Sequence, residues 1–244
     1  MKKNLKNPIK PDKFQFNNAI LVEGKDDLEF IVAFLKKLKI DDKIYVHEVG
    51  GNKGILGVDQ RSLHSCIKDS NFKKYVKNLA IIFDGDGKKD KFKEIVKDLE
   101  QLNKKNEDIN FIIPKVEVEN EINKKPILSP KPISIATSIY LFEQDLESLI
   151  LKTFDNNKYR QILKTCVPKF FECCNLEDVK NKNKFQALLS TQISKKEFKG
   201  VKDIATLSLR EASTNFKNEF INYDHKEFDN IKEFLLNLLR TNKK

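Results

Sequence analysis

Short apolar runs alternate with stretches of helical periodicity over the first 150 residues. Each run has the length of a buried or half-buried strand, and each stretch has apolar residues on one helical face. The predicted strands lie at residues 19–23, 43–49, 79–83 and 110–113, and the longer predicted helices at 26–38 and 90–102. Strands that alternate with helices predict an α/β fold with an open, mostly parallel sheet flanked by helices.

Further elements follow from the same patterns. Residues 50–54 predict a tight turn into a helix that runs through Cys66, and a short helix is expected at 72–77. Residues 114–132 hold four of the seven prolines and predict a loop or lid. A strand at 133–142 then returns to the sheet, and a helix begins at 144 and runs to 151.

Beyond residue 152 the pattern is helical. The predicted helices lie at 157–166, 182–192, 200–211 and 227–240. The chain therefore divides into a flexible basic arm at 1–17, an α/β domain at 18–150 and a helical C-terminal region at 151–244. The sequence leaves open whether this last region folds alone or packs onto the sheet.

Charge is distributed unevenly along the chain. The formal net charge is +10, yet residues 14–150 hold 22 Lys and Arg against 23 Asp and Glu. Residues 1–13 carry +4 and residues 151–244 carry +7. Basic ends beside a balanced core suit a polyanionic partner such as nucleic acid. A composition rich in Lys throughout would also produce such a surplus.

Cysteine and histidine are too few for a zinc site or a disulfide framework. The four cysteines (Cys66, Cys166, Cys173 and Cys174) form no C-x-x-C pair, and there are three histidines. Free, buried thiols in a reducing compartment are expected. Because the chain has neither an apolar run of about 20 residues nor a secretory signal, we expect a cytoplasmic protein with no membrane partner.

Two acidic motifs follow the first and third predicted strands. Residues 22–27 read VEGKDD, and residues 81–87 read IIFDGDG. In an open parallel sheet the carboxyl ends of neighbouring strands share one crevice, so Glu23, Asp27, Asp84 and Asp86 are predicted to meet there. Four carboxylates repel one another unless a cation holds them, and such hard oxygen ligands suit Mg²⁺ or Mn²⁺.

These motifs resemble the Toprim fold family, in which one strand ends in Glu-Gly-x-x-Asp and a later strand in Asp-x-Asp. Topoisomerases, primases, OLD-type nucleases and the ribonuclease that matures 5S rRNA contain this fold, and the first motif is similar to that of the ribonuclease. The chain as a whole resembles small Toprim-related proteins through Gly50-Gly51, Leu146-Glu147 and residues 222–225. The core resemblance covers roughly residues 18–150.

The resemblance implies a set of site residues. Glu23, Asp84 and Asp86 would be catalytic, and these three acids would hold Mg²⁺ or Mn²⁺ together with Asp27. Glu147 is added as a late acidic ligand. The implied activity is metal-dependent phosphodiester hydrolysis of DNA or RNA, in phage defence or RNA processing. One or two such ions could activate water, clamp the phosphate and relieve charge on the leaving oxygen.

Three lysines are predicted to contact phosphates. Lys53 lies on the glycine-rich turn, and Lys182 and Lys184 begin a C-terminal helix. A solvated surface lysine is the plainer interpretation of each. The sequence also leaves open a homodimer and a partner protein within a multi-component system.

Other interpretations compete with the nuclease. A Toprim-like module could bind nucleic acid or a nucleotide as a sensor or scaffold without turnover. Residues 83–87 also resemble the nucleophile motif of haloacid-dehalogenase-type phosphatases, but Lys88 stands where Thr or Val is usual and no later Asp-Asp pair follows. The phosphate-loop motif G-x-x-x-x-G-K-[ST] is absent. Taken singly, Glu23 would cap a helix, and Asp145 and Glu147 would complement a helix dipole.

Overall fold

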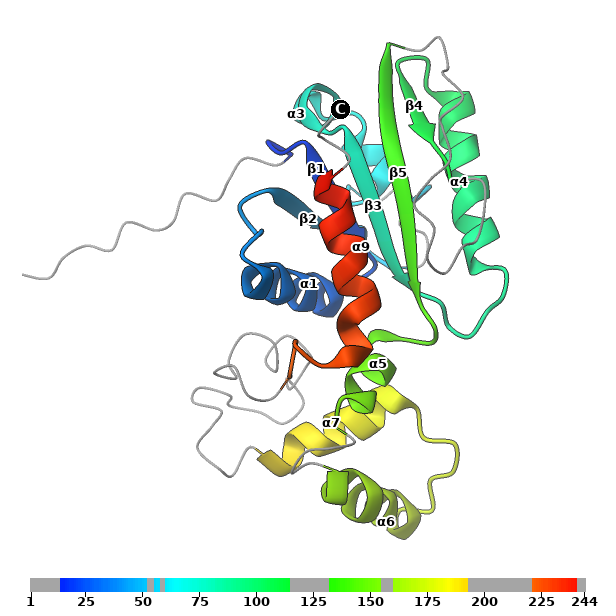
Figure 1. Ribbon diagram of the computed structural model, residues 1–244. Helices are drawn as coiled ribbons and strands as arrows, with labels where there is room; N and C mark the ends of the chain where they lie inside the picture. The colour runs from blue at the N-terminus through cyan, green and yellow to red at the C-terminus, as the bar shows by residue number, and fades with distance from the viewer. Residues whose placement is uncertain are drawn as a thin grey trace, which may run out of the picture.

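A single parallel sheet organises the molecule (Figure 1). The computed structural model describes residues 14–51, 55–57, 60–114, 132–154, 160–192 and 221–240. The strands are β1 (Asn18–Val22), β2 (Ile44–Glu48), β3 (Asn78–Asp84), β4 (Ile109–Ile112) and β5 (Ile133–Phe142). Their order is β2-β1-β3-β5-β4, and all four pairings are parallel. The predicted open α/β sheet is therefore confirmed, with every strand parallel.

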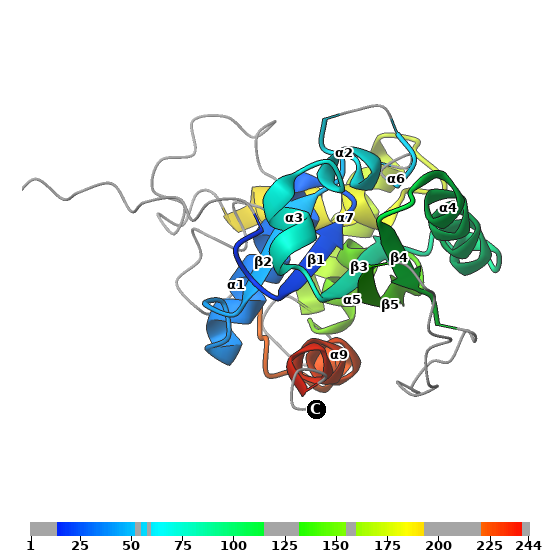
Figure 2. The same ribbon diagram turned by 90° about the horizontal axis from the view of Figure 1, so that it is seen from above.

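Helices cover both faces of the sheet (Figure 2). On one side lie α1 (Lys25–Leu38), α5 (Leu146–Lys152) and α9 (Asp229–Arg240), and on the other α2 (Leu63–Cys66), α3 (Ser70–Tyr75) and α4 (Lys91–Lys105). The central strands are covered on both faces, so β1 is buried along its whole length and β3 up to its last residue. Burial of this kind requires the continuous apolar runs that the sequence shows at these strands.

The C-terminal helices share the core of the sheet. The segments concerned are η1 (Ile162–Cys166), α6 (Val167–Cys173), α7 (Asn181–Gln192) and η4 (Lys226–Phe228), followed by α9. Phe185 of α7 and Leu235 of α9 are fully buried in one apolar cluster with Ile20 and Val22 of β1. Within the described residues, the helical region therefore packs onto the sheet, which settles what the sequence left open.

Most predicted elements agree with the structure to within a few residues, and the exceptions have local causes. The helix predicted to run through Cys66 is only the four residues of α2, because its apolar residues Leu63 and Cys66 point into the core from a short segment. The helix expected to end at 166 continues as α6 to Cys173, with Pro168 tolerated in its first turn. The helix predicted at 200–211 and the loop at 115–131 lie outside the described residues.

The start of the chain and its thiols refine two further predictions. Residues 1–13 lie outside the described part, whereas Phe14 is buried against Tyr45, His47 and Phe72. All four cysteines are free, as expected. Only Cys66 is buried and the other three are exposed, so the expectation of buried thiols was wrong for them.

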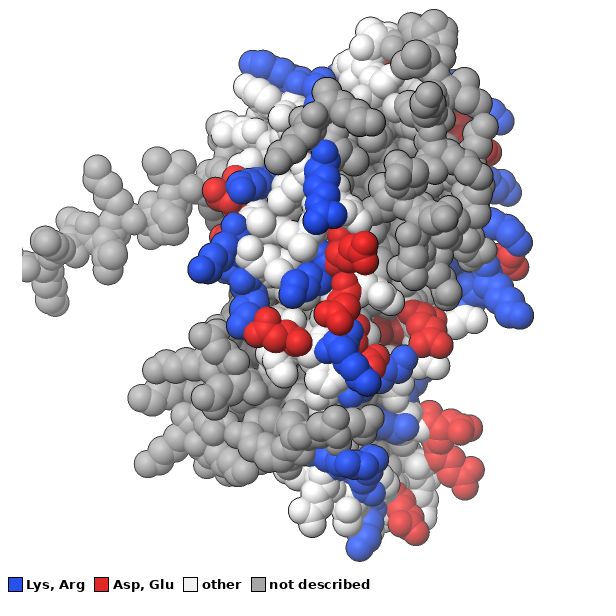
Figure 3. Space-filling model, viewed as in Figure 1, with Lys and Arg blue, Asp and Glu red and all other residues white. Residues whose placement is uncertain are grey.

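Surface charge and helix length bear on possible partners. In Figure 3, acidic and basic side chains are interspersed over the described part of the visible face. Among the described residues, no helix is both long enough and apolar enough to cross a bilayer.

Candidate functional site

The predicted acids converge at the switch point of the sheet. The chain leaves β1 toward β2 through α1 on one face, and leaves β3 through α4 on the other face. Val22 pairs with Ile82, so Glu23 and Asp84 follow at nearly the same level of adjacent strands. Strands in a sheet lie about 4.8 Å apart. The carboxyl ends of β1 and β3 therefore bring the two motifs together in the crevice where open α/β sheets bind ligands.

Glu23 and Asp27 lie at the start of α1. The backbone N–H of Gly24 donates to Asp27 Oδ2 at 2.9 Å, so Asp27 caps the helix as well as facing the other acids. Burial raises the pKa of Asp27 to about 7, against this hydrogen bond and with the charges of Glu147 and Glu23 adding to the rise. Burial also raises the pKa of Glu23, whose Oε2 is buried without a hydrogen-bond partner.

Asp84 is the centre of the group. Its Oδ1 accepts a hydrogen bond of 3.1 Å from the backbone N–H of Leu146, which ties the end of β3 to the start of α5. Burial raises the pKa of Asp84 to about 8, and the charges of Asp27, Glu147 and Glu23 raise it further. Each of these three carboxylates makes ionisation of Asp84 less favourable.

Asp86 occupies the turn that follows β3. Its backbone has a positive φ of 52°, and its N–H donates to the carbonyl of Gln144 at 2.8 Å. Its Oδ2 lies 3.7 Å from Lys88 Nζ and 4.0 Å from Lys91 Nζ. The charge of Asp86 is one of the influences that raise the pKa of Glu23, after burial. Acids of the second motif therefore act electrostatically on the first motif.

Glu147 joins the group from the first turn of α5. It is 7% exposed, burial raises its pKa, and its Oε1 lies 3.9 Å from Lys182 Nζ at the start of α7. Asn181, beside that lysine, donates to Ser148 Oγ at 2.8 Å. Of the predicted phosphate contacts, Lys182 therefore lies at the acidic group, Lys184 is exposed without a described contact to it, and Lys53 lies outside the described residues.

The described acids have the donor atoms that a divalent ion prefers, but they are not positioned to bind one. Their donors are carboxylate oxygens, one of them buried without a partner, and their pKa values are raised chiefly by burial and then by neighbouring acids. Yet within the described part of the chain, no three or more His, Cys, Asp or Glu side chains stand close enough to hold one ion. The group is a cluster of interacting acids and not a preformed metal cage.

Sequence reasoning missed Lys91. This first residue of α4 is 6% exposed, and its charge is the largest influence holding down the pKa of Glu23. Nothing in the sequence separates it from the other 45 Lys and Arg residues, because its burial depends on how α4 packs against β3. Its place shortly after the second acidic motif does not single it out, because Lys88 and Lys89 share that place.

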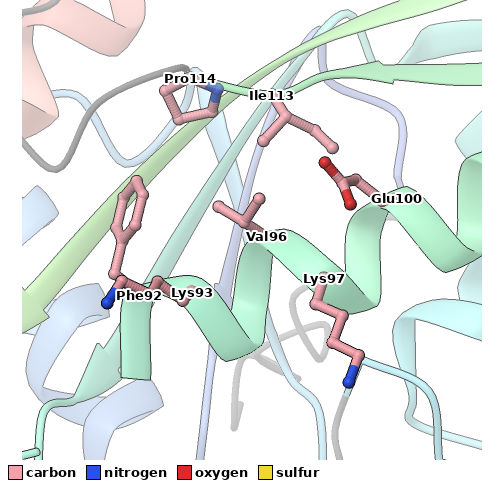
Figure 4. A pocket seen from close by; sticks show the side chains of 7 residues that line it. All are labelled: Phe92, Lys93, Val96, Lys97, Glu100, Ile113 and Pro114. Atoms are coloured by element: carbon pink, nitrogen blue, oxygen red, sulfur yellow. The ribbon is translucent and has the colours of Figure 1, made fainter. Parts of the chain in front are cut away.

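A hollow in the surface lies elsewhere. Figure 4 shows it between α4 and the end of β4, with a volume of about 480 Å³ and with Val96 and Ile113 facing each other across it. Its lining residues are Phe92, Lys93, Val96, Lys97, Glu100, Ile113 and Pro114. None of the predicted site residues takes part, so the carboxylate crevice and this hollow are separate features.

Comparison with known proteins gives the family and no more. Neither the curated proteins nor the solved structures yielded a significant match. A family profile described as a protein of unknown function, DUF3226, matches residues 17–240, which includes every strand and both acidic motifs. The chain therefore belongs to the DUF3226 family of proteins of unknown function.

Proposed function

We propose that this protein hydrolyses phosphodiester bonds of nucleic acid with the help of a divalent cation, as a Toprim-like nuclease. The observation that carries the proposal is that adjacent parallel strands and the start of α5 bring Glu23, Asp27, Asp84 and Glu147 to one end of the sheet, where burial and neighbouring acids raise their pKa values. Lys91 and Lys182 act on these acids, yet the pKa values of Glu23 and Glu147 remain raised, and a bound cation would make the ionised acids less costly. The parallel sheet is the scaffold that the resemblance to the Toprim family implies.

Asp84, Asp86 and Asp27 are the residues that would hold Mg²⁺ or Mn²⁺, and their side chains would have to move toward one another to do so. When bound, such an ion polarises the phosphate and lowers the pKa of a coordinated water. Glu23 Oε2 is buried, has no hydrogen-bond partner and belongs to a carboxyl with a raised pKa, as suits a general base. We therefore assign to Glu23 the role of accepting a proton from the attacking water.

The reaction balances with one water. The water oxygen forms a bond to phosphorus, its proton passes to Glu23 Oε2, the bond from phosphorus to the leaving oxygen breaks, and that oxygen takes a proton from solvent. Lys182, 3.9 Å from Glu147, supplies positive charge beside the acids, and the exposed Lys184 on the same helix would contact a phosphate farther along the substrate. DNA and RNA offer the same chemistry to this site.

The test is cleavage of supercoiled plasmid DNA and of single-stranded RNA with Mg²⁺ or Mn²⁺. We expect the wild-type protein to cut at least one substrate and to stop when EDTA is added. Glu23→Gln and Asp84→Asn should each lower the rate at least about 100-fold, because each removes a group that acts on the reacting atoms. Circular dichroism should show both variants folded.

Matched controls come from exposed acids away from the crevice. Glu107→Gln and Asp41→Asn remove the same charges at solvated positions and should cleave at the wild-type rate. Cleavage by Glu23→Gln or Asp84→Asn at that rate would contradict the mechanism. Binding of nucleic acid without cleavage, unaffected by chelator, would instead support a sensor or scaffold module.

A further inference from the structure

Two charged side chains are buried in the described part of the molecule, and both lie at the acidic crevice. Among the Lys, Arg, Asp and Glu residues that the structure describes, only Glu147 and Lys91 are less than 9% exposed. The buried carboxylate belongs to the proposed site already. The buried ammonium has no role yet, although it lies 4.0 Å from Asp86 Oδ2 and its charge lowers the pKa of Glu23.

The position of Lys91 is unfavourable for a lysine with a purely structural role. It is the first residue of α4, where the helix dipole presents positive charge and favours acidic side chains. Its side chain keeps only 7% of its area exposed, so the ammonium has lost most of its water. Lysines elsewhere on α4, such as Lys104, are exposed. Burial at this end of the helix calls for a compensating interaction.

Asp86 compensates the charge of Lys91 but accepts no hydrogen bond from its ammonium. Its Nζ lies 4.0 Å from Asp86 Oδ2, beyond hydrogen-bond distance, and 6.0 Å from the centre of the Phe83 ring. Lys88 approaches the same carboxylate oxygen more closely, at 3.7 Å. Lys91 is thus held at the crevice at ion-pair range, and an anion oxygen placed between the acids and this ammonium would complete its hydrogen bonding.

We propose that Lys91 is a catalytic residue, whose ammonium donates a hydrogen bond to a non-bridging oxygen of the phosphodiester cleaved at this site. This inference rests on the proposed function. Lys91 stays protonated throughout, and its charge offsets the repulsion between the acids and the incoming phosphate. A dehydrated cation that is already in place acts on the transition state more strongly than one exposed to water.

Substrate with sulfur in place of one non-bridging oxygen tests the contact directly. Mn²⁺ tolerates sulfur ligands better than Mg²⁺ does. With Mn²⁺ as the cation, slower cleavage of a sulfur substrate therefore reports a weakened hydrogen bond from the protein to that position. We expect Lys91→Met to slow cleavage of the oxygen substrate about 100-fold. We expect the wild-type protein to cleave one sulfur diastereomer more slowly than the oxygen substrate. Lys91→Met should cleave that diastereomer and the oxygen substrate at equal rates. Lys104→Met, on the same helix, should match the wild type in both respects.

The outcomes separate this inference from the proposed function. If the wild-type protein cleaves and Lys91→Met cleaves equally fast, the role of Lys91 is overturned while the nuclease stands. If Lys91→Met is slow but keeps the full sulfur effect, Lys91 does not touch the phosphate, and the inference fails. If the wild-type protein does not cleave at all, both proposals fall.

A second variant guards against misfolding. Lys91→Arg keeps the positive charge and can also donate a hydrogen bond to phosphate. We therefore expect it to retain the sulfur effect and to cleave at a rate within about tenfold of wild type. Should Lys91→Met prove unfolded, a folded Lys91→Arg protein that has lost the sulfur effect would overturn the inference.

Discussion

At the scale of single residues, the site is governed first by the burial of its carboxyls and then by the repulsion between them. The pKa of Asp84 rises to about 8 and that of Asp27 to about 7, in both cases chiefly through burial and then through neighbouring acids. Both residues also accept backbone hydrogen bonds that hold α5 and α1 in place. These two carboxyls thus stabilise the fold when they are protonated or bound to a cation. They destabilise it when they are ionised and no cation is present.

A dependence of stability on pH follows from these raised pKa values. In the unfolded chain an Asp carboxyl loses its proton near pH 4. Between about pH 4 and 8 the folded protein therefore binds more protons than the unfolded chain, and its free energy of unfolding falls as pH rises. Asp84→Asn removes the carboxyl with the higher of the two raised pKa values. We expect this variant to gain at least about 1.4 kcal/mol relative to wild type between pH 5 and 8, measured by urea denaturation in EDTA.

A divalent ion should reverse the effect. With Mg²⁺ present, the wild-type protein should regain stability at pH 8, because the ion binds ionised acids in the folded state alone. Asp41→Asn, at an exposed position, should follow the wild type at each pH. A wild-type stability that rises steadily from pH 5 to 8 in EDTA would contradict the raised pKa values.

The residues of the site were predictable where the backbone alone positions them. Glu23 and Asp84 end buried parallel strands, so the sheet brings them together whatever their side chains do. Glu147 could be placed only by its motif, since its approach depends on the tie between Asp84 and α5. Lys91 could not be predicted, because its burial results from side-chain packing around α4 and β3.

At the scale of elements, the turn after β3 fixes the second acidic motif. Gly85 donates its N–H to the carbonyl of Phe142 at 2.9 Å, and a Cβ at Gly85 would lie 2.3 Å from that same oxygen. The contact is with backbone, so no side-chain movement could relieve it. Gly87 has a positive φ of 65°, yet a Cβ there would meet nothing within 4 Å. Two glycines in one turn are thus required for different reasons.

Alanine at these two positions should separate the two reasons. Gly87→Ala should cost about 1 kcal/mol through its left-handed backbone alone. Gly85→Ala should cost more, at least about 2 kcal/mol, because β3 and β5 must move apart at their ends. Both free energies can be measured by guanidinium denaturation. Equal losses would show that the end of β5 yields easily, and that the turn does not fix Asp84 and Asp86.

Element boundaries were predictable to the extent that periodicity reports burial. The apolar runs gave β1 and β3 because both faces of these strands are covered. The pattern around Cys66 overstated α2, since a short segment can bury apolar residues without helical regularity. The predicted helix ended at 166, whereas η1 continues into α6, because proline is accepted in the first turn of a helix.

At the scale of the whole molecule, one apolar cluster joins the two ends of the described chain. Leu235 of α9 and Phe30 of α1 are fully buried in it together with residues of β1 and α5. Tyr140 of β5 also contacts Phe234 of α9, with ring centres 5.3 Å apart. The acidic crevice is therefore held from one side by elements that lie more than 200 residues apart in sequence. Loss of α9 packing should be felt at β1 and α1.

This arrangement predicts a single cooperative unfolding transition that includes the C-terminal helix. Leu235→Ala should lower the free energy of unfolding by about 2–5 kcal/mol, as for other buried leucines. Leu176→Ala makes the same chemical change at a side chain that is 55% exposed, so its effect should stay within about 0.5 kcal/mol. Far-ultraviolet circular dichroism and tyrosine fluorescence should give coincident midpoints for both variants. Two separated transitions in Leu235→Ala would mean that α9 unfolds apart from the sheet, and that the crevice is built by the α/β elements alone.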